Sequence, residues 1–175
     1  MKICNKYDVR FLQYRDKLNS IDIQKANLSF LKNNTNIPII INDNLELLEK
    51  ADGLHIGQED LVELQNKFNI QDKKLLFKLL KKKYNNKIFG LSTHNEFEIL
   101  EANEFDIDYI GLGAYRDTST KDISNILGDN VSYLAKISKH PVGVIGGVKI
   151  TDRIQNITYN VIGSDLLKEK IYAEN

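Results

Sequence analysis

The chain has 175 residues, enough for one domain with a buried core, and its 24 acidic and 24 basic residues cancel. This balance argues against recruitment of nucleic acid or a membrane by net charge. The single cysteine, Cys4, excludes a disulfide framework and a cysteine zinc site, and no apolar stretch has the length of a membrane span. We therefore expect a cytoplasmic protein, a single domain over residues 1–175, that binds neither nucleic acid nor membrane.

Short apolar runs alternate with helical patterns along the whole chain. The runs are nearly continuous in isoleucine, valine and leucine, which is typical of strands covered on both faces. This alternation predicts right-handed crossovers and a parallel sheet. The predicted strands are residues 9–15, 37–42, 53–56, 87–92, 109–113, 142–146 and 160–163. The predicted helices are residues 21–32, 45–49, 61–67, 73–84, 95–102, 130–138, 151–156 and 165–171, with Ser20 and Thr151 as N-caps.

The predicted strands number one fewer than the eight of a closed barrel. The few residues before Val9 cannot hold a βα crossover, which needs about a dozen residues. Glycines recur at strand ends in the second half of the chain, which favours a barrel over a doubly wound sheet. We therefore predict an α/β fold, a TIM-type (βα) barrel lacking its first βα unit. We expect its seam, near Ile3, Val9 and Phe11, to close by direct strand pairing or against a second subunit in a homodimer.

Two aspartates, Asp43 and Asp60, each follow an apolar run that we interpret as a buried parallel strand. Because the carboxyl ends of parallel strands meet at one face of a barrel, we expect the two carboxylates to share a space there. A small number of oxygen ligands, with room left for waters and a phosphate, suits Mg²⁺. The alternative is that both aspartates are helix N-caps, since Leu45 and Leu61 open helical patterns.

Polar side chains alternate at the end of the first predicted strand. Gln13, Arg15 and Lys17 are spaced by two, so an extended chain points all three to one side. An amide, a guanidinium and an ammonium group together suit a phosphate and a heterocycle, and Asn42 adds a donor and an acceptor. The alternative is a solvated strand end that binds nothing.

The segment GLGAYRDTSTKD, residues 111–122, is rich in phosphate-binding groups. Its glycines leave backbone N–H groups approachable, and Thr118, Ser119, Thr120 and Lys121 add three hydroxyls and a cation. The segments VIGGV and VIGSD follow, each ending a predicted strand in glycine. Loops after the last strands of a barrel often bind a phosphate, so two such strand ends in succession indicate a second phosphate site.

Six segments in this order resemble the thiamine-phosphate synthase family, which is related to the thiazole tautomerases. They are QYRDK, which is similar to the family's Gln-Leu-Arg-Glu-Lys motif, and IPIIIND, DGLHIGQEDL, IFGLSTH, DYIGLGAYRDTSTK and HPVGVIGGV. The resemblance runs from about Arg10 to Val148. Each segment is short, but their combination and order are specific.

The resemblance implies a (βα)₈ barrel and a set of site residues. It assigns an aminopyrimidine diphosphate to Gln13, Arg15, Lys17, Asn42, Ser92 and Lys121. It assigns Mg²⁺ to Asp43 and Asp60. It assigns thiazole phosphate to Thr118, Ser119, Thr120, Gly147, Gly163 and Ser164.

The reaction that the resemblance implies is a transfer in thiamine biosynthesis. The pyrimidine methylene carbon joins the thiazole nitrogen, and pyrophosphate leaves. Little proton transfer is needed, so we expect Mg²⁺, Arg15 and Lys121 to act by stabilising the departing anion, with Arg15 and Lys121 as the catalytic residues.

Two other functions stay open at this point. A thiazole tautomerase is an isomerase that needs an acid/base group and no metal, and His94 is the candidate for that group. A non-catalytic ligand-binding or partner protein of the same fold is the third reading. Asp43, Asp60 and Lys121 favour the synthase, because a tautomerase releases no pyrophosphate.

Overall fold

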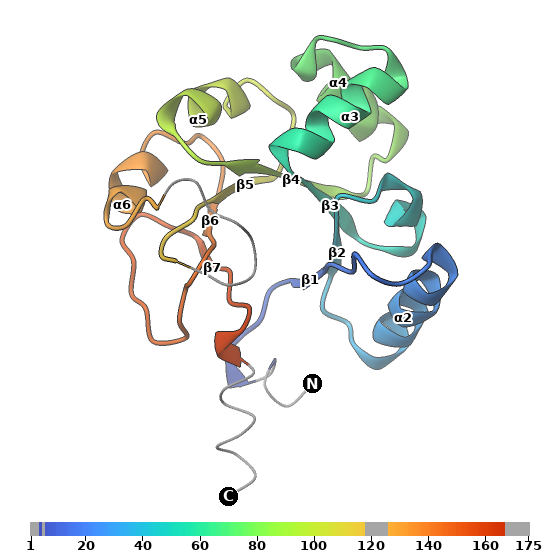
Figure 1. Ribbon diagram of the computed structural model, residues 1–175, viewed down its shortest axis with the longest axis horizontal. Coiled ribbons are helices and arrows are strands. Elements are labelled where there is room, and N and C mark those ends of the chain that lie inside the picture. The colour runs from blue at the N-terminus through green and yellow to red at the C-terminus, as the bar shows by residue number, and fades with distance from the viewer. Residues whose placement is uncertain (1–3, 5, 118–125, 167–175) are drawn as a thin grey trace, which may run out of the picture. The chain divides into compact units, whose positions relative to one another are not determined.

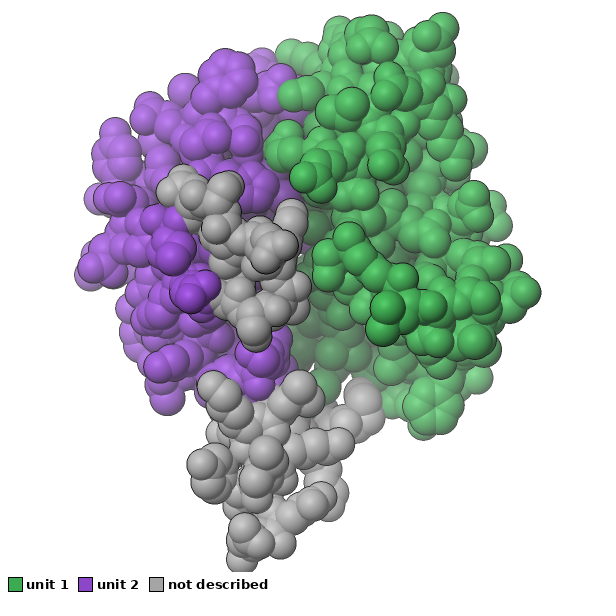
Figure 2. All heavy atoms as spheres, viewed as in Figure 1, with its two compact units in different colours: residues 1–90 green, residues 91–175 purple. Residues whose placement is uncertain are grey.

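A computed structural model describes residues 4, 6–117 and 126–166 of the chain. The chain forms two compact units, Met1–Gly90 and Leu91–Asn175 (Figure 2). Within the described residues, every helix is too short or too polar to cross a membrane. The expectation of one domain over residues 1–175 stays a prediction.

Three parallel strands form the centre of the first unit: β1 (Leu12–Tyr14), β2 (Ile39–Asn42) and β3 (Gly53–Ile56) (Figure 1). The apolar side chains of β2 and β3 are almost completely buried, which explains why their sequences do not alternate. The helices of this unit are α2 (Ile21–Asn34), the 3₁₀ helix η1 (Leu45–Lys50), α3 (Gln58–Phe68) and α4 (Lys73–Lys83).

The second unit repeats this arrangement with strands β5 (Tyr109–Leu112), β6 (Val142–Val144) and β7 (Tyr159–Asn160), all parallel. Its helices are α5 (Glu96–Ala102) and α6 (Asn130–Ala135). Strand β4 (Ile88–Thr93) begins in the first unit, where Ile88 N–H donates to Asp52 O at 2.9 Å, and ends in the second, where Gly113 N–H donates to Thr93 O at 3.2 Å. The strands therefore follow one another in chain order, which confirms the predicted parallel α/β sheet.

The helix predicted over residues 151–156 is wrong. The backbone there forms turns, and Asn156 has a left-handed φ of 63°. The carbonyl of Asp152 accepts a hydrogen bond from the Asn160 side chain at 3.2 Å, in place of a helical N–H. Thr151 is accordingly not an N-cap, whereas Ser20 does precede α2, although its side chain makes no capping bond.

Helix α4 buries one side of its surface. Leu76, Phe77 and Leu80 are buried, whereas Leu75 and Leu79 are 45% and 42% exposed. The buried positions are spaced by three and four, and Phe77 supplies more apolar surface than a leucine, so the helix turns this side inward. The seam between the first and last strands stays a prediction, and Ile3 lies outside the described residues.

Asp52, directly before β3, joins α2, β2 and β4 in the first unit. Its carboxylate accepts hydrogen bonds from Lys32 Nζ at 2.7 and 2.8 Å and from Ile39 N–H at 2.8 Å. Its backbone bonds to Ile39 O at 2.8 Å and accepts from Ile88 N–H at 2.9 Å. Burial acts to raise the pKa of Asp52, but the Lys32 and Ile39 hydrogen bonds outweigh it, so the pKa is lowered.

We expect Asp52→Asn to lower the free energy of unfolding by about 1–2 kcal/mol at pH 7, because a hydrogen-bonded ion pair is lost. A lowered carboxylate pKa stabilises the fold above about pH 4, and this stabilisation is lost as the pH falls through the lowered value. The difference in free energy of unfolding between the wild type and the variant should therefore become smaller at acid pH. Urea unfolding at pH 7 and at pH 3 measures it, with the exposed Asp106→Asn as control; equal differences at both pH values would contradict the prediction.

Candidate functional site

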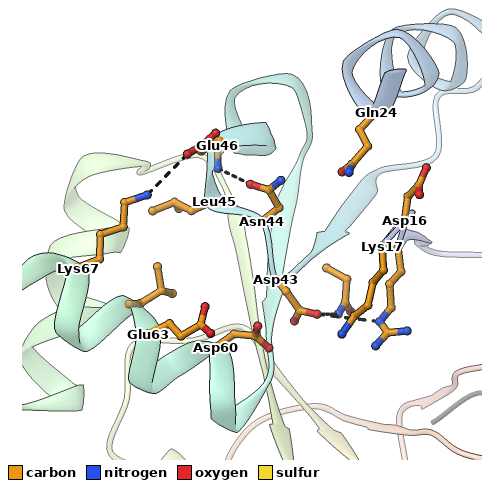
Figure 3. A pocket seen from close by; sticks show the side chains of 13 residues that line it. Asp16, Lys17, Gln24, Asp43, Asn44, Leu45, Glu46, Asp60, Glu63 and Lys67 are labelled. Carbon is orange, nitrogen blue, oxygen red and sulfur yellow. Dashed lines mark hydrogen bonds and ion pairs between the residues drawn. The ribbon is translucent and has the colours of Figure 1, made fainter. Parts of the chain in front are cut away.

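A cavity of about 320 Å³ opens in the first unit, beside the end of β2 (Figure 3). Its walls come from the segment after β1, the start of α2, the end of β2 with the start of η1, and one face of α3. The lining residues are Arg15, Asp16, Lys17, Gln24, Asn42, Asp43, Asn44, Leu45, Glu46, Asp60, Glu63, Leu64 and Lys67. Five of the residues predicted for the pyrimidine and metal site therefore line one space: Arg15, Lys17, Asn42, Asp43 and Asp60.

Asp43 follows β2 in a left-handed conformation with φ of 65°. Its N–H donates to His55 O at 2.9 Å, and its Oδ1 accepts from Gly57 N–H at 3.3 Å. The Asn42 side-chain amide donates to Asp43 Oδ2. Asp43 is not a helix cap, because Asn44 is the N-cap of η1 and accepts from Glu46 N–H. The bonds instead hold the Asp43 carboxylate at the strand end.

Asp60 reaches the same space from the first turn of α3, whose N-cap is Gly57. A Cβ placed on Gly57 would lie 2.5 Å from Asp60 Oδ2 and 3.7 Å from Asp43 Oδ1. The two carboxylate oxygens therefore lie well within the separation of about 10 Å that would argue against a shared ion, whose own ligand distances are about 2.1 Å. Figure 3 shows the Asp60 side chain directed from α3 toward Asp43. The N-cap alternative is thus wrong for both aspartates.

The carboxyl group of Asp60 is affected by its burial and by the nearby Asp43. Burial raises the pKa of Asp60, and the charge of Asp43 and a hydrogen bond with it raise this pKa further, while the Lys17 ammonium acts in the opposite direction. Like charges held this close are unfavourable unless a cation or a proton lies between them. The pair is therefore suited to a divalent cation.

Arg15 and Lys17 supply positive charge to the same cavity. Strand β1 ends at Tyr14, so both residues follow the strand, yet Gln13, Arg15 and Lys17 are all exposed, as their spacing predicts. Arg15 Nε lies 4.0 Å from Asp43 Oδ2. Gln13 does not line the cavity directly; its amide donates to Asn42 Oδ1, and Asn42 in turn donates to Asp43. Gln13 and Asn42 thus orient the aspartate.

The sequence reasoning missed Asp16, which shapes the segment that carries Arg15 and Lys17. The Asp16 carboxylate accepts from Leu18 N–H at 3.1 Å and from Asn19 N–H at 3.0 Å, and the Asn19 side chain adds a third bond at 2.8 Å. These bonds, led by the Asn19 side chain, lower the pKa of Asp16 to about 2. An aspartate whose side chain accepts from the N–H groups two and three residues later forms an Asx turn. The sequence therefore held a signal for this turn, because aspartate is a residue type that favours it.

α3 supplies two further charged residues to the cavity that were not predicted. Glu63 and Lys67 follow Asp60 at helical spacing, and Figure 3 shows them on the cavity side of α3. Lys67 Nζ lies 4.0 Å from Glu46 Oε1 of η1, which brings opposite charges together at the cavity rim. The periodicity of α3 alone was enough to find these residues.

The remaining predicted site residues belong to the second unit. Ser92 lies in β4, Gly147 follows β6 with φ of 65°, and Gly163 and Ser164 are exposed after β7. The predicted phosphate-binding residues Thr118, Ser119, Thr120 and Lys121 lie outside the described residues. Their roles stay predictions.

His94, at the end of β4, has a fixed ring. Its Nδ1 lies 2.9 Å from Glu98 Oε2, and its backbone N–H donates to the same oxygen at 2.8 Å. The side chain of His94 is 40% exposed. A carboxylate that orients an imidazole is a common arrangement for an acid/base group.

Comparison with known proteins identifies the family of the chain. The family model described as thiamine monophosphate synthase matches residues 2–164. The chain belongs to the thiamine monophosphate synthase family. A thiamine-phosphate synthase of Picrophilus torridus is 31% identical over 173 residues, covering 95% of this chain and 78% of that protein. A thiamine-phosphate synthase of Persephonella marina is 35% identical over 147 residues, covering 79% of this chain and 64% of that protein.

A solved structure has the same fold as this chain. The thiamine phosphate pyrophosphorylase of Pyrococcus furiosus matches with a TM-score of 0.62 and 21% identity, covering 81% of this chain and 64% of that chain. The likeness confirms the predicted TIM-type (βα) fold class. This chain therefore spans about two thirds to four fifths of the length of these three proteins.

Proposed function

We propose that the chain forms thiamine phosphate and pyrophosphate from an aminopyrimidine diphosphate and thiazole phosphate. One observation carries the proposal: in a member of this family, the carboxylates of Asp43 and Asp60 and the cations Arg15 and Lys17 face one cavity. A site for a metal-bound diphosphate needs both kinds of group. Cationic side chains bind the negatively charged diphosphate, and carboxylates bind the metal ion that accompanies it.

The residues of the first unit are suited to a reaction in which a carbon–oxygen bond breaks. Arg15 and Lys17 can bind the diphosphate and stabilise the negative charge that grows on it as it leaves. Gln13 and Asn42 hold Asp43 in place through their linked side-chain amides. We propose that Asp43 and Asp60 hold Mg²⁺, which when bound would neutralise charge on the leaving pyrophosphate.

The second unit is proposed to supply the other groups of the reaction. Ser92 and Lys121 are proposed to contact the pyrimidine diphosphate, with Lys121 at the leaving pyrophosphate. Thr118, Ser119, Thr120, Gly147, Gly163 and Ser164 are proposed to bind thiazole phosphate. The thiazole nitrogen then forms the new bond to the pyrimidine methylene carbon as pyrophosphate departs, which leaves no acid/base group with an essential task.

Incubation of the purified chain with both substrates and Mg²⁺ tests the proposal. We expect equal amounts of thiamine phosphate and pyrophosphate, detected by chromatography and by a coupled pyrophosphatase assay, and a strong loss of rate when EDTA removes the metal. Omission of either substrate is the control. Failure to form thiamine phosphate at saturating concentrations of both substrates would reject the synthase function.

A thiazole tautomerase is the second candidate, and the contact between His94 and Glu98 favours it. If the chain is a synthase, His94→Ala should keep turnover within about 10-fold of wild type, because removal of a true acid/base group typically costs 10²–10⁴-fold. Turnover of His94→Ala in the synthase assay is the measurement. Loss of all activity in this variant, with Asp43→Ala and Asp60→Ala both active, would move the assignment to the tautomerase.

A further inference from the structure

An ion pair in the second unit joins two loops that follow neighbouring strands. We define the β5 loop as residues 113–117 and the β6 loop as residues 145–152. Arg116 Nη1 donates to Asp152 Oδ2 at 2.6 Å, and Arg116 Nη2 donates to Asp152 Oδ1 at 3.0 Å. The same Nη1 donates to Gly147 O at 3.2 Å. A bidentate contact of this kind fixes the orientation of the guanidinium relative to the carboxylate as well as their distance.

The β5 loop packs closely against a glycine turn in the β6 loop. Gly146 and Gly147 have positive φ values of 87° and 65°, which other residues rarely adopt. A Cβ on Gly147 would lie 2.8 Å from Arg116 Cβ, too close for any side chain. Backbone bonds add to the contact, because Tyr115 N–H donates to Ile145 O and Arg116 N–H donates to Gly146 O, each at 2.9 Å. The shape of the turn therefore depends on the β5 loop.

The β6 loop is also held at its far end. Asp152 accepts from Lys149 N–H at 2.8 Å, and Asp165, after β7, accepts from Ile150 N–H at 3.0 Å. The Asp152 side chain is only 12% exposed. Its hydrogen bonds with Arg116 hold the pKa of Asp152 below its usual value, so the pair stays ionised at neutral pH. Arg116 and Asp152 thus form the side-chain link between a loop held at both ends and its neighbour.

We propose that Arg116 and Asp152 are positioning residues that hold the turn at Gly146 and Gly147 in the shape that receives the phosphate of the second substrate. This inference rests on the proposed function, since thiazole phosphate is the second substrate there. A turn of small residues offers backbone N–H groups to an anion only while its conformation is held. Neither Arg116 nor Asp152 needs to touch the phosphate for this purpose.

A direct role for Arg116 as a phosphate ligand makes a different prediction. Its charge is already balanced by Asp152, and two of its terminal N–H groups bind the carboxylate. If Arg116 were the ligand, Asp152→Asn would free its charge and strengthen phosphate binding. If the pair positions the turn, Asp152→Asn and Arg116→Ala both loosen the turn, and both weaken phosphate binding.

The test follows the backbone amide signals of Gly146 and Gly147 by NMR while inorganic phosphate is added to the full chain. We expect both signals to shift in the wild type, with about 10-fold weaker apparent binding in Arg116→Ala and in Asp152→Asn, as expected for loss of one charge-assisted contact. Arg116→Lys should recover part of the affinity. Arg153→Ala is the matched control, because Arg153 directly follows Asp152 and, among the described residues, its hydrogen bonds go to the backbone carbonyls of Ile150 and Asp152.

Steady-state kinetics gives the second readout. In Arg116→Ala we expect the KM for thiazole phosphate to rise about 10-fold, while the KM for the pyrimidine diphosphate stays within about 2-fold. Three results would each overturn the proposal. The first is an equal rise in both KM values, and the second is that the amide signals of Gly146 and Gly147 do not shift with phosphate in the wild type. The third is unchanged or tighter phosphate binding in Asp152→Asn. A wild-type chain that forms no thiamine phosphate would reject the proposed function alone, because the NMR titration still decides the role of the pair.

Discussion

Replacement of Asp60 by asparagine is expected to lower turnover by roughly 10²–10³, and replacement of Asp43 should do the same, because each removes a charge that is proposed to hold the metal at the leaving group. The change is nearly isosteric, so the cavity keeps its shape. Turnover should be measured at saturating concentrations of both substrates over a range of Mg²⁺ concentrations. Glu59→Gln is the matched control, since Glu59 lies in the same first turn of α3 and does not line the cavity.

The same variant should change how stability depends on pH and on Mg²⁺. Because the pKa of Asp60 is raised in the fold, the folded state holds its proton more tightly than the unfolded chain does. The free energy of unfolding therefore falls as the pH rises from about 4 through the raised pKa, and this part of the pH dependence should vanish in Asp60→Asn. Added Mg²⁺ should raise the Tm of the wild type at pH 7 and leave the variant unchanged. An equal Mg²⁺ response in both proteins would argue against metal binding by Asp60.

Sequence patterns predicted the fold best where one local signal dominated. β3 was predicted with its observed bounds, and β2, β4 and β5 lie within two residues of the predicted ends, because a buried parallel strand is a continuous apolar run between turns. The helix predicted over residues 151–156 failed for the opposite reason. The conformation of that segment depends on Asp152, which bonds to Arg116 and Asn160, and contacts made across several loops leave no local pattern.

The candidate site was predicted in part for a similar reason. The convergence of Asp43 and Asp60 follows from the rule that parallel strands end at one face, although Asp60 reaches the cavity from the first turn of α3 instead of the strand itself. The chain of amides from Gln13 through Asn42 to Asp43 depends on side-chain directions that spacing alone cannot give. The part of the site in the Thr118–Lys121 segment lies outside the described residues and stays a prediction.

Arg15→Ala is expected to lower turnover by roughly 10²–10³ and to leave the fold intact, because Arg15 is proposed to stabilise the charge on the departing pyrophosphate. Its side chain is 37% exposed and its Nε lies at 4.0 Å from Asp43 Oδ2, so little packing or ion-pair energy is lost with it. The loss should appear mainly in kcat, because the charge on the leaving group is larger in the transition state than in the bound substrate. Lys121→Ala should behave in the same way if Lys121 contacts the same leaving group.

Arg10→Ala is the matched control for Arg15→Ala, because Arg10 precedes the same strand and pairs with exposed Asp8 at 2.9 Å, away from the cavity. The free energy of unfolding of both variants should lie within about 0.5 kcal/mol of the wild-type value, as is usual for exposed positions. Arg15→Lys keeps the charge but loses the planar fork, so it should recover part of the rate. Turnover near the wild-type value in both Arg15→Ala and Lys121→Ala would show that neither cation stabilises pyrophosphate. Recovery in Arg15→Lys together with a normal KM would locate the contribution of Arg15 in its charge, acting after the substrate is bound.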